Sequence, residues 1–361
     1  MNVDGTPYRS IWYDIVSDSV QIIDQTLLPH HFEIKSLHSV ADMVEAITTM
    51  QVRGAPLIGV AAAFGLYLSL RDDPQSKNKA MDSLRATRPT AVNLSWAMAA
   101  ADKVLAPLRP SAQPEAALRF AMQLADEDVK TCEAIGEQGC EVLEKLWHSK
   151  ADQTAPLNVL THCNAGWLAT VDWGTALSVL YKAQLKGIPL HVWVDETRPR
   201  NQGAFLTTWE LQKQGIPNTL IADNTGGHLM QQGLVDVCLV GSDRTTASGD
   251  VCNKIGTYLK ALAAADNKVP FYVALPISTI DFEIHDGVKE IPIEQRDGSE
   301  VLSISGLDES GTRRTVSLAH PEVSAGNYGF DVTPARLVTA LITEKGVFTA
   351  DRESIACLKE R

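Results

Sequence analysis

An acid, an amide and a cation lie close together in the segment 236–257, where Asp243 is followed by Asn253 and Lys254. The apolar run 237–240 before them predicts a buried strand, and a helical pattern is expected after Cys252. Ligands of open α/β sheets bind at such strand ends, and these three groups suit a small anionic substrate. Taken alone, the segment is more simply interpreted as a solvated loop whose polar residues cap helices.

A thiol follows another predicted strand, because Cys163 comes directly after residues 158–162. A cysteine thiol has a pKa of about 8.5, and a helix N-terminus or nearby cations lower it, so Cys163 could act as a base or nucleophile. A thiol and an acid that face each other across a pocket suit proton transfer at a carbon beside an oxygenated centre, without a metal or redox cofactor. Most other cysteines are expected to be small core residues: Cys132, Cys140, Cys238 and Cys252.

Two arginines and a glutamine lie at further predicted turns. Arg53 precedes Gly54 and Ala55 at the start of a very apolar helix, with Pro56 in its first turn. Backbone N–H groups at that position, with an arginine beside them, could hold a phosphate, although the small residues could equally serve close packing. Arg88 is a second arginine in a turn. Gln202 comes next to a predicted helix start and is expected to contact a ligand.

The composition restricts the class of partner. The 361 residues are 45% hydrophobic, which is enough for sizeable cores and about two domains. The formal charge is -12 and the pI is about 5.2, so the whole molecule repels polyanions. We therefore expect no nucleic-acid partner, and any anionic ligand must be held by a local cluster of cations.

The cysteine pattern and the N-terminus restrict the compartment. The six cysteines are scattered without a Cys-x-x-Cys pair or a matching histidine spacing, so no metal site is expected. The N-terminus lacks a charged region followed by an apolar one, and no apolar run reaches membrane-spanning length. These features predict a cytoplasmic protein without a membrane partner.

The order of the patterns predicts an α/β protein in two domains. Residues 1–130 are expected to be mainly helical with small β elements. Short strands are predicted between residues 10 and 35. Helices are predicted at 39–50, from 53 onward, at 97–105 and at 114–146, the last of which continues into the second domain. Residues 131–361 alternate between strands and helices, and parallel crossovers between them predict a Rossmann-like, doubly wound sheet. Its strands are expected at 158–162, 190–194, 219–221, 237–240 and 271–275, and its helices at 175–185, 204–212, 226–232 and 254–264. Residues 71–79 are predicted to be a loop, 278–328 irregular and 334–343 a final helix.

Together, these segments resemble the methylthioribose-1-phosphate isomerase family of the methionine salvage pathway. The wider superfamily also contains ribose-1,5-bisphosphate isomerase and regulatory subunits of a translation-initiation exchange factor. The resemblance extends over nearly the whole chain. Its motifs are Thr26-Leu-Leu-Pro, Met50-Gln-Val-Arg-Gly-Ala-Pro, Arg88-Pro-Thr-Ala-Val-Asn-Leu, Thr161-His-Cys-Asn-Ala-Gly, Val194-Asp-Glu-Thr-Arg-Pro, Gly241-Ser-Asp-Arg, Gly249-Asp-Val-Cys-Asn-Lys-Ile-Gly-Thr, Glu290-Ile-Pro-Ile-Glu and Phe330-Asp-Val-Thr-Pro.

The resemblance implies a fold, an activity and a set of site residues. The fold is a mainly helical N-terminal domain followed by a Rossmann-like domain, in a homodimer. The activity is conversion of S-methyl-5-thio-alpha-D-ribose 1-phosphate to S-methyl-5-thio-D-ribulose 1-phosphate. By motif, Cys163 and Asp243 are the catalytic pair. The substrate-binding positions are Arg53, Gly54, Ala55, Arg88, Gln202, Asn253 and Lys254.

The implied reaction places a specific demand on the acid. A phosphate on the anomeric oxygen prevents spontaneous opening of the sugar ring, so some group must protonate the ring oxygen. Asp243 can do so only if burial raises its pKa. Cys163 as a thiolate could then move the C2 proton, or it could stabilise a transition state in which hydride migrates from C2 to C1, and the sequence does not choose between these routes. Another 5-substituted substrate, such as 5-deoxyribose 1-phosphate or ribose 1,5-bisphosphate, and a non-catalytic regulatory role also stay open.

Overall fold

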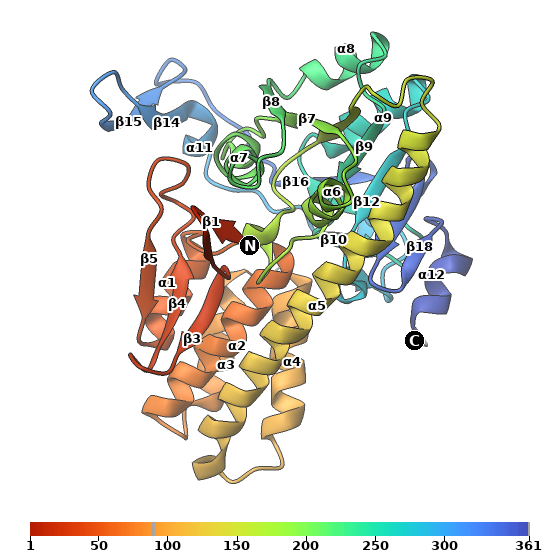
Figure 1. The fold of residues 1–361 in the computed structure, drawn as a ribbon. Helices are drawn as coiled ribbons and strands as arrows, with labels where there is room; N and C mark the ends of the chain where they lie inside the picture. The colour runs from red at the N-terminus through yellow and green to blue at the C-terminus, as the bar shows by residue number, and fades with distance from the viewer. Residues whose placement is uncertain (89–90, 360–361) are drawn as a thin grey trace.

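The computed structural model describes residues 1–88 and 91–359. Figure 1 shows a helical region that holds the first part of the chain and an α/β region built around a large sheet. The long helix α5 (Gln113–His148) runs from one region into the other. None of the helices described combines the length and the apolar character that crossing a bilayer requires.

In the described part of the helical region, a small antiparallel sheet and four α-helices precede α5. Its strands are β3 (Ile11–Asp14), β4 (Ser19–Ile23) and β5 (Ile34–Leu37), and its helices are α1 (Val40–Thr48), α2 (Ala55–Asp72), α3 (Lys77–Thr87) and α4 (Val92–Leu105). The short pair β1 (Asn2–Val3) and β2 (Thr6–Pro7) precedes them. Ser39 caps α1 as predicted, accepting a hydrogen bond from the backbone N–H of Asp42. Nearly the whole length of α2 is buried, because its small and aliphatic residues pack on every side.

The predicted loop at 71–79 is wrong at both ends, since α2 continues to Asp72 and α3 begins at Lys77. Arg71 stabilises the last turn of α2, because its guanidinium donates to the Asp72 carboxylate and to the backbone oxygens of Asp18 and His38. The Arg88 motif of the sequence includes Pro89 and Thr90, which lie outside the described residues.

Helix α5 contributes to two cores. Its earlier apolar residues, such as Ala117 and Ala121, pack with α2 and α4, whereas Ile135 and Leu143 pack with the large sheet. The proposed division between residues 130 and 131 therefore falls inside a continuous helix, near the point where it passes from one core to the other. That division stays a proposal.

The large sheet has the strand order of a doubly wound dinucleotide-binding fold. Its seven strands run in the order β18, β17, β12, β9, β6, β7, β8, and all neighbours are parallel except β17 and β18. The strands are β6 (Leu157–Thr161), β7 (Leu190–Asp195), β8 (Asn218–Ile221), β9 (Val237–Val240), β12 (Phe271–Ala274), β17 (Ala340–Thr343) and β18 (Gly346–Phe348). Numbered along the chain, the six parallel strands follow the order 3-2-1-4-5-6, whose switch point lies between β6 and β9.

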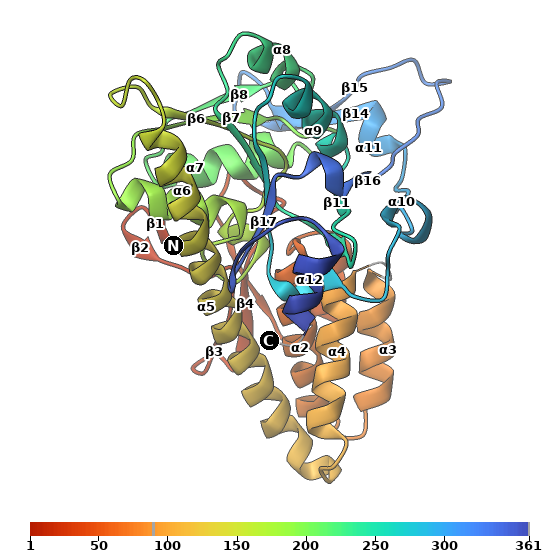
Figure 2. The ribbon, with the colours of Figure 1, turned by 90° about the vertical axis from the view of Figure 1, so that its right-hand side faces the viewer.

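Helices cover both faces of this sheet, so the fold-class prediction is confirmed. Alternate strand residues point to opposite faces: Val159 packs toward α5, α6 (Ala176–Leu185) and α7 (Thr208–Lys213). Leu160 packs toward α8 (Thr225–Gln231), α9 (Thr257–Asp266) and α12 (Arg352–Lys359). Figure 2 shows α12 near β17.

A second sheet, which the sequence analysis missed, lies beyond the end of β9. It pairs β13 (Ile280–Asp281), β10 (Arg244–Thr246), β11 (Val251–Lys254) and β16 (Phe330–Thr333) in that order. The helix predicted at 254–264 therefore begins later, at Thr257, because the residues before it pair with β16. Asn253 and Lys254 thus project from a strand.

Two further expectations fail near the C-terminus. The helix predicted at 334–343 is a short 3-10 turn followed by β17, because the apolar run 340–343 completes the large sheet beside β12. The span 278–328 is not wholly irregular. It contains α10 (Gly287–Glu290), α11 (Ser299–Leu302) and the hairpin of β14 (Ser303–Leu307) and β15 (Arg313–Ser317), which projects at the upper left of Figure 1.

Candidate active site

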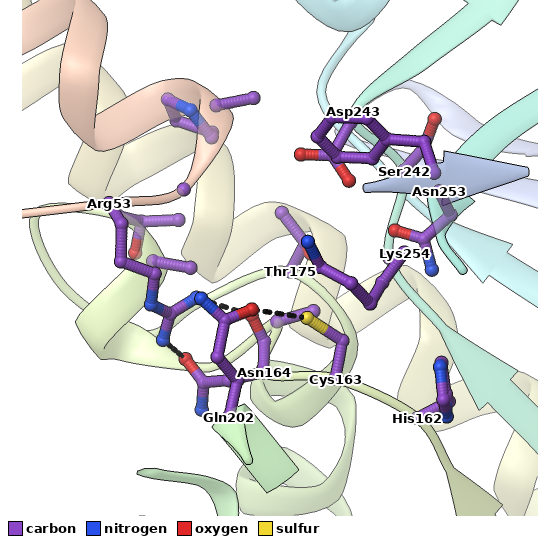
Figure 3. Close-up of a pocket in the computed structure, with 18 of the residues that line it drawn as sticks. Arg53, His162, Cys163, Asn164, Thr175, Gln202, Ser242, Asp243, Asn253 and Lys254 are labelled. Atoms are coloured by element: carbon purple, nitrogen blue, oxygen red, sulfur yellow. Dashed lines mark hydrogen bonds between the residues drawn. The ribbon is translucent and has the colours of Figure 1, made fainter. Parts of the chain in front are cut away.

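One cavity of about 650 Å³ lies at the carboxyl end of the large sheet, where the helical region meets it. All nine predicted site residues line this cavity: Arg53, Gly54, Ala55, Arg88, Cys163, Gln202, Asp243, Asn253 and Lys254. Figure 3 labels six of them: Arg53 before α2, Cys163 and Asp243 after β6 and β9, Gln202 before α7, and Asn253 and Lys254 on β11. Arg88 follows the last residue of α3. We refer to this space as the first cavity.

The proposed catalytic pair lies on the two sides of the topological switch point. Cys163 follows β6 and Asp243 follows β9, and these strands are direct neighbours in the sheet. Because the connections from them lead to opposite sides, a crevice opens between their carboxyl ends. The fold thus brings together two residues that lie 80 positions apart.

Cys163 is fixed by its neighbours in an uncommon backbone conformation. Its φ is 66°, a left-handed value that a non-glycine residue adopts only when its surroundings impose it. The backbone N–H donates to Oγ1 of Thr197 at 2.8 Å, and the carbonyl accepts from Oγ1 of Thr207 at 2.7 Å. The thiol donates to Oε1 of Gln202, with 3.0 Å between sulfur and oxygen. These contacts direct the thiol into the cavity (Figure 3).

Burial raises the pKa of the Cys163 thiol, although the charges of Lys254 and Arg53 oppose the effect. The sequence-based expectation of a thiol activated by nearby cations is therefore not met in the free protein. The cations are present, but removal of the sulfur from water outweighs them. Cys163 is a neutral hydrogen-bond donor at neutral pH.

Burial also raises the pKa of the Asp243 carboxyl, and the charges of Lys254, Arg88 and Arg53 oppose that shift. The direction is the one that a proton donor needs. The backbone N–H of Asp243 donates to the carbonyl of Cys252 at 2.9 Å, which holds the end of β9 against β11. The carboxyl group faces the cavity (Figure 3).

The start of α2 forms one wall through Arg53, Gly54 and Ala55. Gly54 has a φ of 100°, and an added Cβ would lie 2.3 Å from the backbone oxygen of Ala169, so only glycine fits. Arg53 is buried and donates through Nη1 to the backbone oxygen of Asn164 at 2.8 Å and through Nη2 to its Oδ1. This contact ties α2 to the residue that follows Cys163.

The other cations and the amide are also held by protein partners. Nη2 of Arg88 lies 3.0 Å from Oε2 of Glu294. Nζ of Lys254 lies 4.6 Å from the centre of the Phe330 ring. The Nδ2 of Asn253 donates to Oγ1 of Thr257 at 3.1 Å. These contacts fix a positive wall around the space between Cys163 and Asp243.

A buried acid that sequence reasoning missed supports this wall from behind. Glu210 in α7 accepts from Nδ2 of Asn164 at 2.9 Å and from the hydroxyl of Tyr181 at 2.7 Å. It also accepts from the backbone N–H groups of Trp167 and Leu168. Glu210 therefore orients Asn164, which in turn holds Arg53. Its place on a predicted helix gave no sign of this role.

His162 was also missed, although it lies within a recognised motif. Its Nδ1 is 2.8 Å from Oδ2 of Asp195, and its Nε2 is 2.8 Å from the backbone oxygen of Ile255. Nζ of Lys260 lies 3.1 Å from the same Asp195 oxygen. The network joins the end of β6 to the residue after Lys254. His162, Asp195 and Asp223 are close enough to suggest metal ligands, but the Lys260 ammonium already contacts Asp195, so we assign the cluster a structural role.

Comparisons with known proteins agree over the whole chain. A sequence profile of the Initiation factor 2 subunit family matches residues 51–350. The methylthioribose-1-phosphate isomerase of Methylorubrum extorquens is 56% identical over 360 residues, which cover 99% of this chain and 98% of that protein. The crystal structure of 5-methylthioribose 1-phosphate isomerase from Pyrococcus horikoshii OT3 is 38% identical, with a TM-score of 0.82, and covers 100% of this chain and 99% of that one. The translation initiation factor eIF-2B, subunit delta, from A. fulgidus is 40% identical, with a TM-score of 0.78, over 95% of this chain and 96% of that one.

Proposed function

The chain belongs to the Initiation factor 2 subunit family and groups there with methylthioribose-1-phosphate isomerases, and from this premise we propose the reaction and the role of each site residue. The proposed reaction converts the aldose S-methyl-5-thioribose 1-phosphate to the ketose S-methyl-5-thioribulose 1-phosphate in methionine salvage. The observation that carries it is the convergence of Cys163 and Asp243 in one cavity, with burial raising the pKa of the acid.

Asp243 is the proposed proton donor. Its carboxyl protonates the ring oxygen as the bond between that oxygen and C1 breaks, and the bonding electrons leave with the oxygen. C1 becomes an oxocarbenium centre that still carries the phosphate ester. The Asp243 carboxylate then accepts the proton of the C2 hydroxyl as C2 becomes a carbonyl carbon, so the acid returns to its starting form.

The hydrogen on C2 moves to C1 by one of two routes. If Cys163 first gives its own proton to solvent, the thiolate takes the C2 proton to give an enol phosphate and returns it to C1. If Cys163 stays neutral, the hydrogen migrates with its electron pair directly to the cationic C1. The raised pKa of Cys163 supports the second route, in which the thiol excludes water and stabilises the migrating charge.

The walls of the first cavity suit a substrate with one phosphate and one apolar end. Arg53, Arg88 and Lys254 supply positive charge, and two of these cations already contact protein carboxylate or aromatic groups. Met50, Pro276 and Phe330 supply an apolar surface for a methylthio group. We assign the phosphate to the cationic wall and the 5-substituent to the apolar one.

Turnover of a substrate pair tests this assignment. The protein is expected to isomerise methylthioribose 1-phosphate at least a hundredfold more efficiently, in kcat/KM, than ribose 1,5-bisphosphate. A higher kcat/KM for ribose 1,5-bisphosphate would overturn the proposed substrate. Absence of turnover with both compounds would favour a non-catalytic role.

The assembly and location are further proposals. We propose a homodimer in the cytoplasm, with the sugar phosphate as its small-molecule partner. The six free cysteines suit a reducing compartment. The formal charge of -12 argues against a nucleic-acid partner. Analytical ultracentrifugation tests the dimer, and a monomer at micromolar concentration would contradict it.

A further inference from the structure

A second cavity, of about 820 Å³, lies beside the first and shares three of its lining side chains, Met50, Arg53 and Gln202. Its other walls come from the turn after β4, the turn between β7 and α7, and the segment from α11 to the β14–β15 hairpin. Of the two cavities, only the first is lined by all nine proposed site residues. The second cavity therefore has no role in the reaction as described above.

Three residues that line the second cavity each carry a buried polar atom with no hydrogen-bond partner among the described residues. These atoms are Oε1 of Gln25, Oδ1 of Asn201 and Nε of Arg53. The three residues are 4%, 4% and 5% exposed. The Nε2 of Gln25 already donates to the backbone oxygen of Leu168 at 2.7 Å. An unsatisfied buried polar group costs about 1–3 kcal/mol, so two unpaired acceptors and one unpaired donor on residues of the same cavity wall favour a polar ligand there.

The charges around the second cavity favour an anion. Arg53, Arg200 and Arg313 line it, and Glu300 is the acidic residue among its lining residues. The Glu300 carboxylate already accepts from Nη1 of Arg200 at 2.9 Å and from Arg296. The walls thus carry more positive than negative charge. An anion would satisfy the arginines, and hydroxyl groups on it would satisfy the two amide oxygens.

The shared side chains connect this space to the catalytic thiol. Gln202 accepts the hydrogen bond of the Cys163 thiol, and Arg53 holds Asn164, the next residue in the chain. A ligand that contacts Nε of Arg53 from the second cavity acts on the same guanidinium whose charge lowers the pKa of Cys163. A ligand in the second cavity can therefore change the surroundings of Cys163 through Arg53 and Gln202, without occupying the first cavity.

We propose that the second cavity binds a small hydroxyl-bearing anion of the sugar-phosphate class, as a ligand additional to the substrate, and that its binding alters the reactivity of Cys163. Any consequence of the altered Cys163 for turnover rests on the proposed function, whereas the binding itself does not. The ligand donates hydroxyl hydrogens to Gln25 and Asn201, and its anionic group lies near Arg313 and Arg200.

Ribose 5-phosphate is the probe, and calorimetric titration of the full chain measures its binding. The Asp243→Asn protein is first saturated with methylthioribose 1-phosphate, so that the first cavity is filled. Ribose 5-phosphate is expected to bind all the same. It should also change the rate at which iodoacetamide alkylates Cys163 in the unsubstituted, substrate-free protein by at least twofold.

Paired variants locate the ligand. Arg313→Glu should weaken ribose 5-phosphate binding at least tenfold, whereas Arg314→Glu should not, because Nε of Arg314 lies 3.1 Å from Asp308 in the hairpin and does not line the cavity. Asn201→Gly is a second test that keeps the left-handed φ of 54° and removes the amide. Neither Arg313 nor Arg314 is buried, so both proteins should fold.

Three outcomes would overturn the proposal: no binding of ribose 5-phosphate, complete displacement by methylthioribose 1-phosphate, or equal binding to the Arg313→Glu and Arg314→Glu proteins. Failure of the proposed function has a different signature. In that case methylthioribose 1-phosphate does not bind the Asp243→Asn protein, while the difference between the two arginine variants still reports on the second cavity.

Discussion

The thiol of Cys163 donates a hydrogen bond to the side-chain oxygen of Gln202, with 3.0 Å between Sγ and Oε1. An oxygen acceptor at this position stabilises the protonated sulfur, in the same direction as the burial that raises the pKa of Cys163. The free protein thus holds a neutral thiol and, in Asp243, a carboxyl whose pKa is also raised. Two groups that can carry a proton lie on opposite sides of the crevice between β6 and β9.

The first prediction concerns Lys254, whose charge lowers the pKa of Cys163 against the effect of burial. Lys254→Met should raise that pKa further and slow alkylation of Cys163 by iodoacetamide at pH 8 at least threefold. Peptide mass spectrometry measures the rate in the substrate-free protein. Lys289→Met is the control, because Lys289 is exposed on α10. An unchanged or faster rate in Lys254→Met would show that the charge of Lys254 does not act on the thiol.

The second prediction concerns the path of the C2 hydrogen. If the thiol stays neutral, the hydrogen migrates within the substrate, and a reaction run in deuterated water should give a product without deuterium at C1. Proton NMR of the product after many turnovers measures this. One deuterium per product at C1 would instead require a thiolate that exchanges its proton with solvent.

The third prediction concerns His162, which links Asp195 to the backbone oxygen of Ile255 beside Lys254. His162→Gln should raise KM for methylthioribose 1-phosphate about tenfold, since Asn253 and Lys254 lose their fixed position relative to Cys163. His191→Gln is the control, because His191 lies on β7 and its Nε2 is 3.0 Å from Oγ1 of Thr219. A folded His162→Gln protein with an unchanged KM would remove His162 from the positioning of the site.

The fourth prediction uses Asp128 in α5, whose pKa burial raises to about 7, with a further contribution from Asp172. In the unfolded chain this carboxyl ionises near 3.8, so the folded state binds more protons between about pH 4 and pH 7. Stability should therefore fall as pH rises through that window, by up to about 1.4 kcal/mol per pH unit, and then level off.

Asp128→Asn removes the fall in stability with rising pH. The amide keeps an oxygen that can accept a hydrogen bond from the backbone N–H of Val171. The variant's gain in melting temperature over the unsubstituted protein should be larger at pH 8 than at pH 4.5. Asp126→Asn is the control on the same helix, since Asp126 is exposed and pairs with Arg9. A gain of equal size at both pH values would contradict the raised pKa.

Much of the fold was predictable from the sequence, because long periodic segments report their own burial. Five of the six parallel strands of the large sheet were expected within about one residue of their observed bounds, and the cap at Ser39 was found. The strand β11 was missed because two of its four residues are polar. It forms by pairing with β10 and with the distant β16, where Asn253 lies opposite Asp331. The strand β17 was mistaken for a helix because a short apolar run has no period of its own.

The candidate site was predictable as a set of residues but not as a network. Strand ends and motifs indicated the nine predicted site residues, all of which line the first cavity, since chain order and sheet topology fix where strand ends meet. The contacts that hold them depend on distant partners, such as Glu210 behind Asn164 and Glu294 beside Arg88. The neutral state of Cys163 was also beyond the sequence, because the loss of water around the sulfur depends on the distant residues that the fold packs around it.

Turnover by two substituted proteins tests the roles of Cys163 and Asp243 most directly. With methylthioribose 1-phosphate, Asp243→Asn should lower kcat about a thousandfold, because general acid catalysis contributes about 10²–10⁴-fold, and Cys163→Ser should lower it at least a hundredfold. Both proteins should keep the melting temperature of the unsubstituted protein within a few degrees. Cys357→Ser and Asp82→Asn, which change exposed residues, should retain full activity. A folded Asp243→Asn or Cys163→Ser protein with near-normal kcat would contradict the proposed mechanism.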